Sequence, residues 1–315
     1  MTTRIAIIGL GSIAQKAYLP ILATWEGIEP LFCSRAGDTV ETLQAKYRVT
    51  RGTTRLEELL DWQPKAAFVL TATSAHYDIA SQLLAAGVDV FLEKPAALTS
   101  QQARHLSQQA QAGQRVLMVG FNRRYAPLHR IARDIWGQRR VDIAVLQKHR
   151  SSGFHPNLVV HYTEEMIHII DMLRFFCGEA EATLTSYQEN GKLSWGASTV
   201  SLQQGGYGAV LASMQAGHWK EQYVLHGEGA SLYVDAFANV KLISGGEQRV
   251  WEETYASSWK TTLEGRGFYG EIVHFMDCVE QRATPQTSGW EAVKTQQLAE
   301  AMVALAKPIQ ANPSV

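Results

Sequence analysis

The chain has 315 residues, of which 46% are hydrophobic and 19% charged, a composition typical of a globular protein long enough for two domains. The 29 lysines and arginines nearly balance the 30 aspartates and glutamates, so no basic excess is available to hold a nucleic-acid backbone. No apolar run reaches the length of a membrane span, and the three cysteines are too far apart for a disulfide framework or a zinc ribbon. We therefore expect a cytoplasmic protein that acts on a small, modestly charged partner, without nucleic acid or membrane.

The first 120 residues alternate short apolar runs with amphipathic helical patterns. Runs typical of buried strands span residues 4–10, 28–34, 65–73, 88–94 and 115–121, and predicted helices span residues 12–25, 38–47, 55–60, 76–87 and 99–113. Apolar strands separated by helices indicate βαβ units and a parallel sheet covered on both faces. Residues 1–121 are thus predicted to form a doubly wound α/β domain of the Rossmann type.

The pattern changes after residue 121. A linking helix is predicted at residues 125–137, a strand at 141–150 and a long helix at 161–178. Alternating, glycine-punctuated runs from residue 182 to 253 indicate antiparallel strands, and two helices follow at 270–282 and 290–306. We expect residues 122–315 to form a substrate-binding α+β domain with a large, mostly antiparallel sheet. Its open apolar face predicts a homodimer or homotetramer, because such a face is normally buried by a partner.

A glycine fingerprint, Gly-Leu-Gly-Ser-Ile-Ala, follows the first predicted strand and opens the first predicted helix. Gly9 allows a tight turn, Gly11 lets the backbone approach a pyrophosphate, and Ala14 stands at the third position of the dinucleotide motif. The start of the helix offers N–H groups to the anion. A simple strand-to-helix turn is the alternative, but the place in the first βαβ unit favours a dinucleotide. The predicted contacts are Gly9, Gly11, Ser12, Ile13 and Ala14.

The end of the second predicted strand bears on which dinucleotide is bound. Glu29 lies at the usual count for an acid on the ribose, but it begins the strand and so lies at the wrong end. The other end carries Ser34 and Arg35, with no acid until Asp38. A hydroxyl and a guanidinium suit a 2′-phosphate, so we expect NADP in preference to NAD. The alternative is that Arg35 covers the adenine edge or faces solvent.

Lys94 stands at the carboxyl end of the apolar run 88–94, and Pro95 stiffens the turn that follows. Ligands of open parallel sheets bind outside the carboxyl ends of the strands, so Lys94 is predicted to face the nicotinamide region. The alternative is a solvated loop start, where most lysines lie.

Several motifs together resemble the Gfo/Idh/MocA oxidoreductases. They are "GLGSIAQ" at residues 9–15, "TATSAHYDIA" at 71–80, "EKP" at 93–95 and "VGFNRRYAP" at 119–127. The resemblance covers nearly the whole chain. Within the family, "GLGSIAQKAYLP" and "LQKHRSS" are similar to the MviM-like branch.

The resemblance implies that Lys94 binds the substrate hydroxyl and lowers its pKa, as a nearby cation does. It also implies a second cluster, since the family pattern Asp-x-x-x-His-x-x-Asp is matched by Glu164, His168 and Asp171. With His161, these positions would fall within roughly 80° of one face of an α-helix. His168 is then expected to be the general base, with Glu164 orienting it or relaying its proton, and Asp171 a sugar-binding or helix-positioning group.

Two departures from the family pattern bear on this cluster, namely Glu164 in place of aspartate and the bulky Met166. A core histidine is the alternative for His168. A metal site on this stripe is not favoured, because Lys94 already supplies an electrophile. The other predicted cofactor contacts are Thr71, Thr73, His76, Glu93, Lys94 and Asn122. The predicted substrate contacts are Lys94, Arg123, Lys148, His161, His168 and Asp171.

The function expected from these residues is hydride transfer between NADP or NAD and a secondary hydroxyl or carbonyl of a sugar, polyol or related small molecule. Two alternatives stay open. One is a non-catalytic, regulatory or structural cofactor-binding protein, which the departures at Glu164 and Met166 allow. The other is NAD-dependent hydrolysis of a glycoside by a protein of the same fold.

Overall fold

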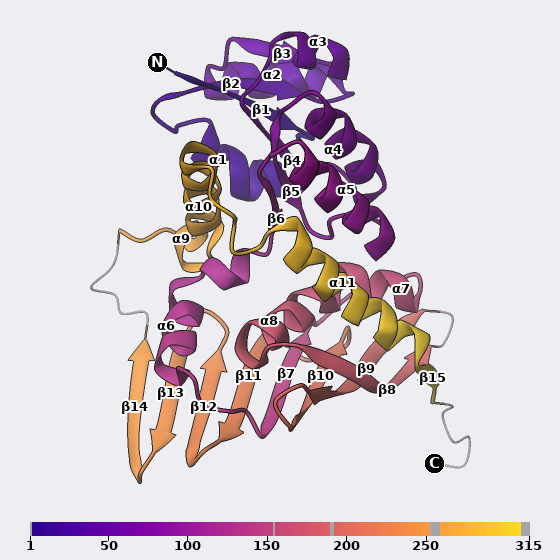
Figure 1. Ribbon diagram of the computed structural model, residues 1–315, viewed down its shortest axis with the longest axis vertical. Helices are drawn as coiled ribbons and strands as arrows, with labels where there is room; N and C mark the ends of the chain where they lie inside the picture. Colours follow the sequence, from indigo (N-terminus) through magenta and orange to yellow (C-terminus); the bar gives the residue numbers. More distant parts are fainter. Residues whose placement is uncertain (1, 154, 190–191, 253–258, 310–315) are drawn as a thin grey trace. The chain divides into compact units, whose positions relative to one another are not determined.

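The computed structural model describes residues 2–153, 155–189, 192–252 and 259–309 (Figure 1). Its contacts divide the chain into two compact units. The first unit comprises Met1–Phe121 and Phe268–Lys294, and the second comprises Asn122–Gly267 and Thr295–Val315. The predicted domains place all of residues 122–315 together, whereas Phe268–Lys294 belongs to the first unit.

The first unit is built on a parallel sheet of six strands in the order β3-β2-β1-β4-β5-β6. The strands are β1 (Thr3–Ile8), β2 (Ile28–Cys33), β3 (Arg51–Thr53), β4 (Ala66–Val69), β5 (Asp89–Glu93) and β6 (Leu117–Gly120). Every residue of β4 and β5 is buried, as expected for strands covered on both faces. The predicted Rossmann sheet is confirmed. Strand β3 was not predicted, because it is short and mostly exposed and so carries no apolar run.

The helices of the first unit are η1 (Ala14–Tyr18), α1 (Leu19–Leu22), α2 (Gly37–Tyr47), α3 (Leu56–Asp61), η2 (Thr73–Ala75), α4 (His76–Ala85), α5 (Ser100–Ala112) and α10 (Phe268–Gln281). Aromatic packing accounts for the place of α10. The ring of Phe275 lies 5.1 Å from that of Phe68 on β4 and 5.6 Å from that of Phe91 on β5, measured between centroids. Such edge contacts bury large apolar rings against the parallel sheet.

The register of this sheet aligns the strand ends. Ile8 pairs with Cys33 of β2 and with Val69 of β4, and Val69 pairs with Leu92 of β5. The segments that leave β1, β2, β4 and β5 therefore begin at one edge of the sheet, where ligands of such folds bind.

The second unit is built on a nine-stranded sheet in the order β14-β13-β12-β11-β7-β10-β9-β8-β15. The strands are β7 (Ile143–His149), β8 (Ala180–Glu189), β9 (Leu193–Leu202), β10 (Gly206–Ser213), β11 (Lys220–Gly227), β12 (Ala230–Asp235), β13 (Asn239–Ser244), β14 (Glu247–Glu252) and β15 (Ala306–Pro308). Most neighbours are antiparallel, but β7 with β10 and β8 with β15 are parallel. The large, mostly antiparallel sheet is confirmed, as a mixed sheet.

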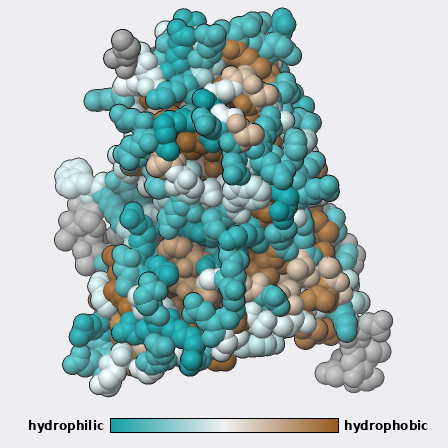
Figure 2. Space-filling view, viewed as in Figure 1, coloured by the Kyte–Doolittle hydropathy of each residue, from teal (hydrophilic) through white to brown (hydrophobic). Residues whose placement is uncertain are grey.

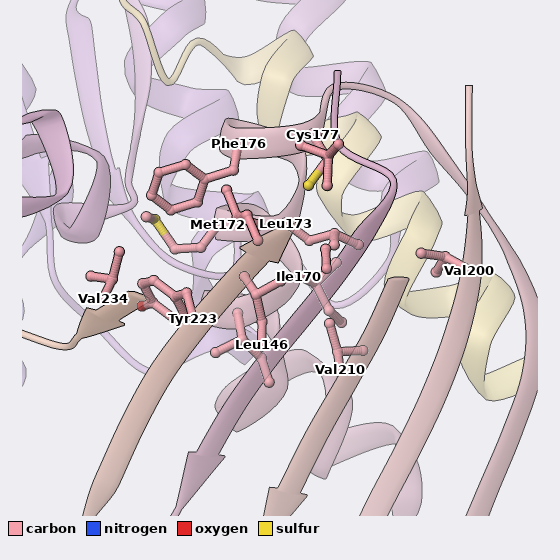
Figure 3. Close-up of a cluster of buried hydrophobic side chains, with 14 of the residues drawn as sticks. Leu146, Ile170, Met172, Leu173, Phe176, Cys177, Val200, Val210, Tyr223 and Val234 are labelled. Atoms are coloured by element: carbon pink, nitrogen blue, oxygen red, sulfur yellow. The ribbon is translucent and has the colours of Figure 1, made fainter. Parts of the chain in front are cut away.

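The helices of this unit are η3 (Asn122–Tyr125), α6 (Pro127–Trp136), α7 (Leu158–Val160), η4 (His161–Met166), α8 (Ile167–Cys177), α9 (Thr262–Gly265) and the later part of α11 (Gly289–Ala304). Among them, α6, η4, α8 and α11 pack against the sheet. Figure 3 shows Ile170 and Leu173 of α8 beside Leu146 of β7 and Val210 of β10, and all four side chains are fully buried. Burial alternates along β11, so a single face of the sheet forms the core.

The surface of the first unit is mostly hydrophilic around β2, β3, α2 and α3, at the top of Figure 2. Within the described residues, no helix has both the length and the apolar character to cross a membrane.

Candidate active site

The glycine turn after β1 combines a crowded position with an open one. Gly9 has a φ of +88°, and a Cβ there would lie 2.7 Å from backbone atoms of Leu70 and Thr71, so only glycine fits. No atom lies within 4 Å of a Cβ placed on Gly11. Ser12 and Ile13 are exposed, whereas Ala14 is fully buried. The turn is thus tied to the end of β4 at Gly9 and leaves open space at Gly11.

Two observations show that a dinucleotide fits this turn. Helical geometry begins at Ser12, and the N–H of Gln15 donates to the Gly11 carbonyl at 3.0 Å, so the N–H groups before Gln15 are available to an anion. The Thr71 hydroxyl oxygen is buried and has no hydrogen-bond partner in the described part of the chain. A buried hydroxyl without a partner is costly, so a polar ligand group beside it would satisfy it.

Glu29 lies at the far edge of the sheet from this turn. It pairs in register with Arg4, near the start of β1, and its carboxylate forms an ion pair with Arg51 at 2.8 Å. An acid at this end cannot serve a ligand bound at the carboxyl ends of the strands.

The carboxyl end of β2 carries the residues predicted to select NADP. Ser34 is half-buried and Arg35 is exposed. Cys33, just before them, is buried, and burial together with the carboxylates of Glu57 and Glu58 raises the pKa of its thiol to about 11. This end of the strand therefore offers one cation to solvent, with two carboxylates of α3 nearby.

Lys94 follows β5 in a turn that hydrogen bonds of Glu93 stabilise. The backbone N–H of Lys94 donates to Glu93 Oε2 at 2.8 Å, and the Tyr18 hydroxyl lies 2.7 Å from Glu93 Oε1 and 2.9 Å from Glu271 Oε1. Burial and then the charges of Glu271 and Glu93 raise the pKa of Tyr18 well above its ordinary value. Glu93 thus supports the backbone of Lys94 through Oε2 and accepts from Tyr18 through Oε1, and its predicted contact with the cofactor stays a prediction.

His76 joins two segments that leave this edge of the sheet. Its ring is 1% exposed, with Nδ1 2.8 Å from the Pro95 carbonyl and Nε2 3.0 Å from the Thr71 carbonyl. The His76 ring therefore ties the Lys94 turn to the segment after β4, and its predicted contact with the cofactor stays a prediction. Thr73 lies half-buried in η2 of that segment.

In the second unit, the predicted polar stripe does not form a single face. The helix predicted at residues 161–178 begins with a π-helix, η4, before it continues as α8. The hydrogen bonds of a π-helix span one more residue than those of an α-helix, so the expected spacing is lost. Its members reach different partners, because Asp171 binds Arg124 at 2.7 Å and His168 binds Arg123 at 2.7 Å.

Two of the predicted substrate contacts, Asp171 and His161, are buried, and their roles stay predictions. Asp171 is 1% exposed and accepts both of its Arg124 hydrogen bonds inside the unit. His161 is fully buried, and a Cβ on Gly196 of β9 would lie 3.1 Å from its ring. Within the described residues neither ring nitrogen of His161 has a hydrogen-bond partner, and burial followed by the charge of His155 lowers its pKa to about 4.

Arg123 connects a buried carboxylate to His168. Its Nε and Nη2 donate to Glu221 at 2.5 and 2.7 Å, and its Nη1 lies 2.7 Å from His168 Nδ1. Burial alone would raise the pKa of Glu221. The charge of the Arg123 guanidinium outweighs that effect and lowers the pKa to about 2. Arg123 was predicted as a substrate contact. In the structure it is 8% exposed and holds the half-buried His168.

Lys148 lies in a second buried ion pair. It is 2% exposed, and its Nζ lies 2.7 Å from Glu165, which also pairs with Arg150 at 2.7 Å. Burial and the charge of Arg123 lower the pKa of Lys148 to about 7. Lys148 is therefore not a solvated strand end, and its predicted contact with the substrate stays a prediction.

Neither Glu165 nor Glu221 was among the predicted site residues. Glu221 could have been found from the alternation of residues along β11. It lies on the same face of the strand as Tyr223 and Leu225, which are both fully buried, so a carboxylate is predicted among core residues. Glu164, predicted to support His168, is half-buried on η4, and this role stays a prediction.

Asn122 supports a turn of the second unit. Its side-chain amide donates to the Arg266 carbonyl at 2.8 Å, and Gly267 follows with a φ of +85°. A Cβ on Gly267 would lie 2.1 Å from the Asn122 carbonyl oxygen, so glycine is required there. The predicted contact of Asn122 with the cofactor stays a prediction.

Known proteins resemble both units. A family model described as "Oxidoreductase family, NAD-binding Rossmann fold" (Gfo/Idh/MocA) matches residues 3–121. YceM of Salmonella typhimurium, provisionally named an oxidoreductase, is 32% identical over 324 residues, covering 96% of this chain and 97% of its own. An inositol 2-dehydrogenase of Burkholderia cenocepacia is 23% identical over 329 residues, covering 96% and 94%. The solved structure of the dehydrogenase MviM from Clostridium difficile superposes with a TM-score of 0.88 at 25% identity, covering 96% and 99%.

The fold and the glycine turn thus define an NAD(P)-binding Rossmann oxidoreductase. The chain belongs to the Gfo/Idh/MocA oxidoreductase family. The resemblance to the MviM-like branch agrees with the solved dehydrogenase.

The two glycines of the turn should respond differently to alanine. Gly9→Ala introduces a Cβ at a positive φ against Leu70 and Thr71, so it should lower the unfolding free energy by about 1–3 kcal/mol. Gly11→Ala meets open space, so stability should stay within about 0.5 kcal/mol. The added methyl group should weaken binding of the reduced cofactor by about tenfold or more, because the backbone must approach the pyrophosphate there. Denaturant unfolding and fluorescence titration measure the two effects. Undiminished cofactor affinity in Gly11→Ala would place the pyrophosphate elsewhere.

Buried carboxylates should make the second unit sensitive to acid. Glu165 and Glu221 have pKa values of about 2 when folded, below the ordinary 4.5, so the unfolded state takes up protons first as the pH falls. Their stabilisation is present above about pH 4.5 and is lost as the pH falls towards about 2. His161 adds to the loss below its ordinary value of 6.5, because its folded pKa is about 4.

Denaturant unfolding between about pH 7 and 3 tests this dependence. The double variant Lys148→Met, Glu165→Gln should show a slope shallower by about one proton below about pH 5. Glu247→Gln, whose side chain is 72% exposed, should leave the slope unchanged. A double variant with the slope of the wild type would show that Glu165 is not ionised in the folded protein.

Proposed function

We propose that this protein transfers a hydride between a nicotinamide dinucleotide and the secondary hydroxyl or carbonyl carbon of a sugar, polyol or related small molecule. The observation that carries the proposal is the shared edge of the first sheet, where the glycine turn after β1 and the Lys94 turn after β5 both begin. When bound, the nicotinamide ring supplies or accepts the hydride. The name of the inositol 2-dehydrogenase relative supports the polyol class of substrate.

Lys94 is the group proposed to bind the substrate oxygen. A cation beside a hydroxyl lowers its pKa and favours the alkoxide from which hydride departs. In the opposite direction the same cation polarises the carbonyl. Glu93 fixes the backbone of Lys94 through the hydrogen bond at 2.8 Å, so the cation is carried on a supported turn. His168, half-buried in the second unit, is proposed as the second group on the substrate oxygen.

NADP is the proposed preferred cofactor. Arg35 is exposed beside Ser34 at the carboxyl end of β2, and the only acid at the expected count, Glu29, is paired with Arg51 at the opposite edge. A guanidinium can bind a 2′-phosphate through two parallel hydrogen bonds. The nearby Glu58 is itself paired with Arg55 at 3.4 Å, which reduces its repulsion of a phosphate.

Variants of Lys94 test the proposed function. Purified protein is titrated with NADPH and NADH, and turnover is then measured with a panel of polyols and keto sugars. We expect tighter binding of NADPH, and a loss of about 10²–10³-fold in kcat in Lys94→Ala with little change in cofactor affinity. Lys65→Ala is the matched control, because this exposed lysine precedes β4 at the opposite edge of the sheet. Full activity in Lys94→Ala would refute the role of Lys94, and cofactor binding without turnover on any substrate would favour a non-catalytic protein.

A second copy of this chain is the proposed partner of the nine-stranded sheet. Ile143, Leu184, Tyr207 and Val250 lie on four of its strands and are 45–47% exposed. Exposed apolar side chains on a broad sheet favour pairing with a like surface, which gives a homodimer or homotetramer. Light scattering should give a mass of two or four chains, and Tyr207→Lys should lower it. A mass of one chain for the wild type would contradict the proposal.

A further inference from the structure

The contact between Arg123 and His168 determines where the imidazole carries its proton. A guanidinium has N–H donors and no acceptor. Arg123 Nη1 lies 2.7 Å from His168 Nδ1, so Nδ1 must accept this hydrogen bond. A ring nitrogen that accepts carries no hydrogen, and the hydrogen of the neutral ring is therefore on Nε2.

Arg123 is fixed in the orientation that donates to His168. Its Nε and Nη2 form a bidentate ion pair with Glu221, which is fully buried. The Arg123 carbonyl oxygen lies 3.0 Å from His129 Nδ1. Burial lowers the pKa of Arg123, but the Glu221 carboxylate raises it above its ordinary value, so the guanidinium stays charged. A bidentate ion pair restricts both the rotation and the position of the guanidinium.

Arg123 opposes a second proton on His168, whereas Glu164, a half-buried carboxylate four positions earlier on η4, is the nearest acid in sequence. Arg123 faces it directly, and Lys148 of β7 lies close enough for Arg123 to lower its pKa. The carboxylates of Glu221 on β11 and Glu165 on η4 are each already paired with one of these cations. Protonation of Nδ1 would replace the hydrogen bond from Arg123 with two N–H groups that face each other.

We propose that Arg123 is a positioning residue that fixes the hydrogen of His168 on Nε2, so that His168 meets the substrate oxygen as a hydrogen-bond donor. This role replaces the predicted general base. The contact of His168 with a substrate oxygen rests on the proposed function. The position of the proton on the His168 ring rests only on the contact with Arg123. In oxidation, the hydroxyl proton passes to solvent water while the Lys94 cation stabilises the alkoxide, and the electron pair of the C–H bond leaves as hydride to the nicotinamide. Reduction reverses both transfers, and His168 keeps its proton throughout.

Nitrogen NMR of the protein labelled with ¹⁵N-histidine tests the proton position without any substrate. The shifts of the two ring nitrogens distinguish the tautomers, and the spectrum of His168→Gln assigns the signals. We expect His168 in the Nε2–H form, still neutral at about pH 6, near the ordinary histidine value. A hydrogen on Nδ1, or a ring that titrates at the ordinary value, would overturn the proposal.

Two double variants show whether Arg123 is the cause. Arg123→Gln with Glu221→Gln removes both buried charges together, and it should let His168 populate both tautomers and gain a proton at higher pH. Arg124→Gln with Asp171→Asn is the matched control, because it removes a neighbouring buried ion pair of the same kind. It should leave the His168 signals unchanged. Unchanged signals in the Arg123 variant would refute the positioning role, and if that variant does not fold, the wild-type spectrum still decides the proton position.

Kinetics separate a donor from a base. The amide of His168→Gln can donate a hydrogen bond but cannot take a proton at neutral pH, whereas His168→Ala can do neither. If His168 is a donor, kcat should fall by about 10²–10³ in His168→Ala and by at most about tenfold in His168→Gln. Equal losses of kcat in both variants would support the role of His168 as the general base and contradict the donor role. Absence of turnover in the wild type would refute the proposed function and leave the NMR result standing.

Discussion

The alignment of strand ends in the first sheet is the constraint on which the rest of the site depends. Because β1, β4 and β5 are parallel and in register, the glycine turn, the Thr71 segment and the Lys94 turn all begin at one edge. His76 and Glu93 then fix those turns to one another and to the sheet. The cofactor site and its cation therefore follow from the topology of one sheet, and individual side chains refine it.

The second unit uses buried ion pairs in place of open polar residues. Arg123 with Glu221, Arg124 with Asp171, and Lys148 with Glu165 are all nearly excluded from solvent. Removing such charges from water costs several kcal/mol for each ion, so these pairs contribute little net stability compared with apolar side chains of the same volume. They do fix direction, since a guanidinium held by a carboxylate through two hydrogen bonds has its remaining N–H groups fixed in direction as well. The geometry of His168 is the consequence.

The sequence predicted those features that repeat along the chain or follow a local rule. The Rossmann sheet was apparent from the alternation of apolar runs and helices, and Gly9, Gly11 and Lys94 lie at strand ends. The π-helix at His161–Met166 was not predicted. Its hydrogen bonds span one residue more than those of an α-helix, and this difference does not change the order of apolar and polar residues in so short a segment. The place of α10 depends on aromatic contacts between residues about two hundred positions apart, which no local pattern reports.

A crystal structure of the complex with NADPH tests the central claim most directly, because the shared sheet edge makes a definite statement about where the cofactor lies. We predict the pyrophosphate within hydrogen-bond distance of the N–H groups that follow Gly11, and the nicotinamide ring beside the Lys94 side chain. A pyrophosphate away from the glycine turn, or a nicotinamide ring out of reach of Lys94, would contradict the account.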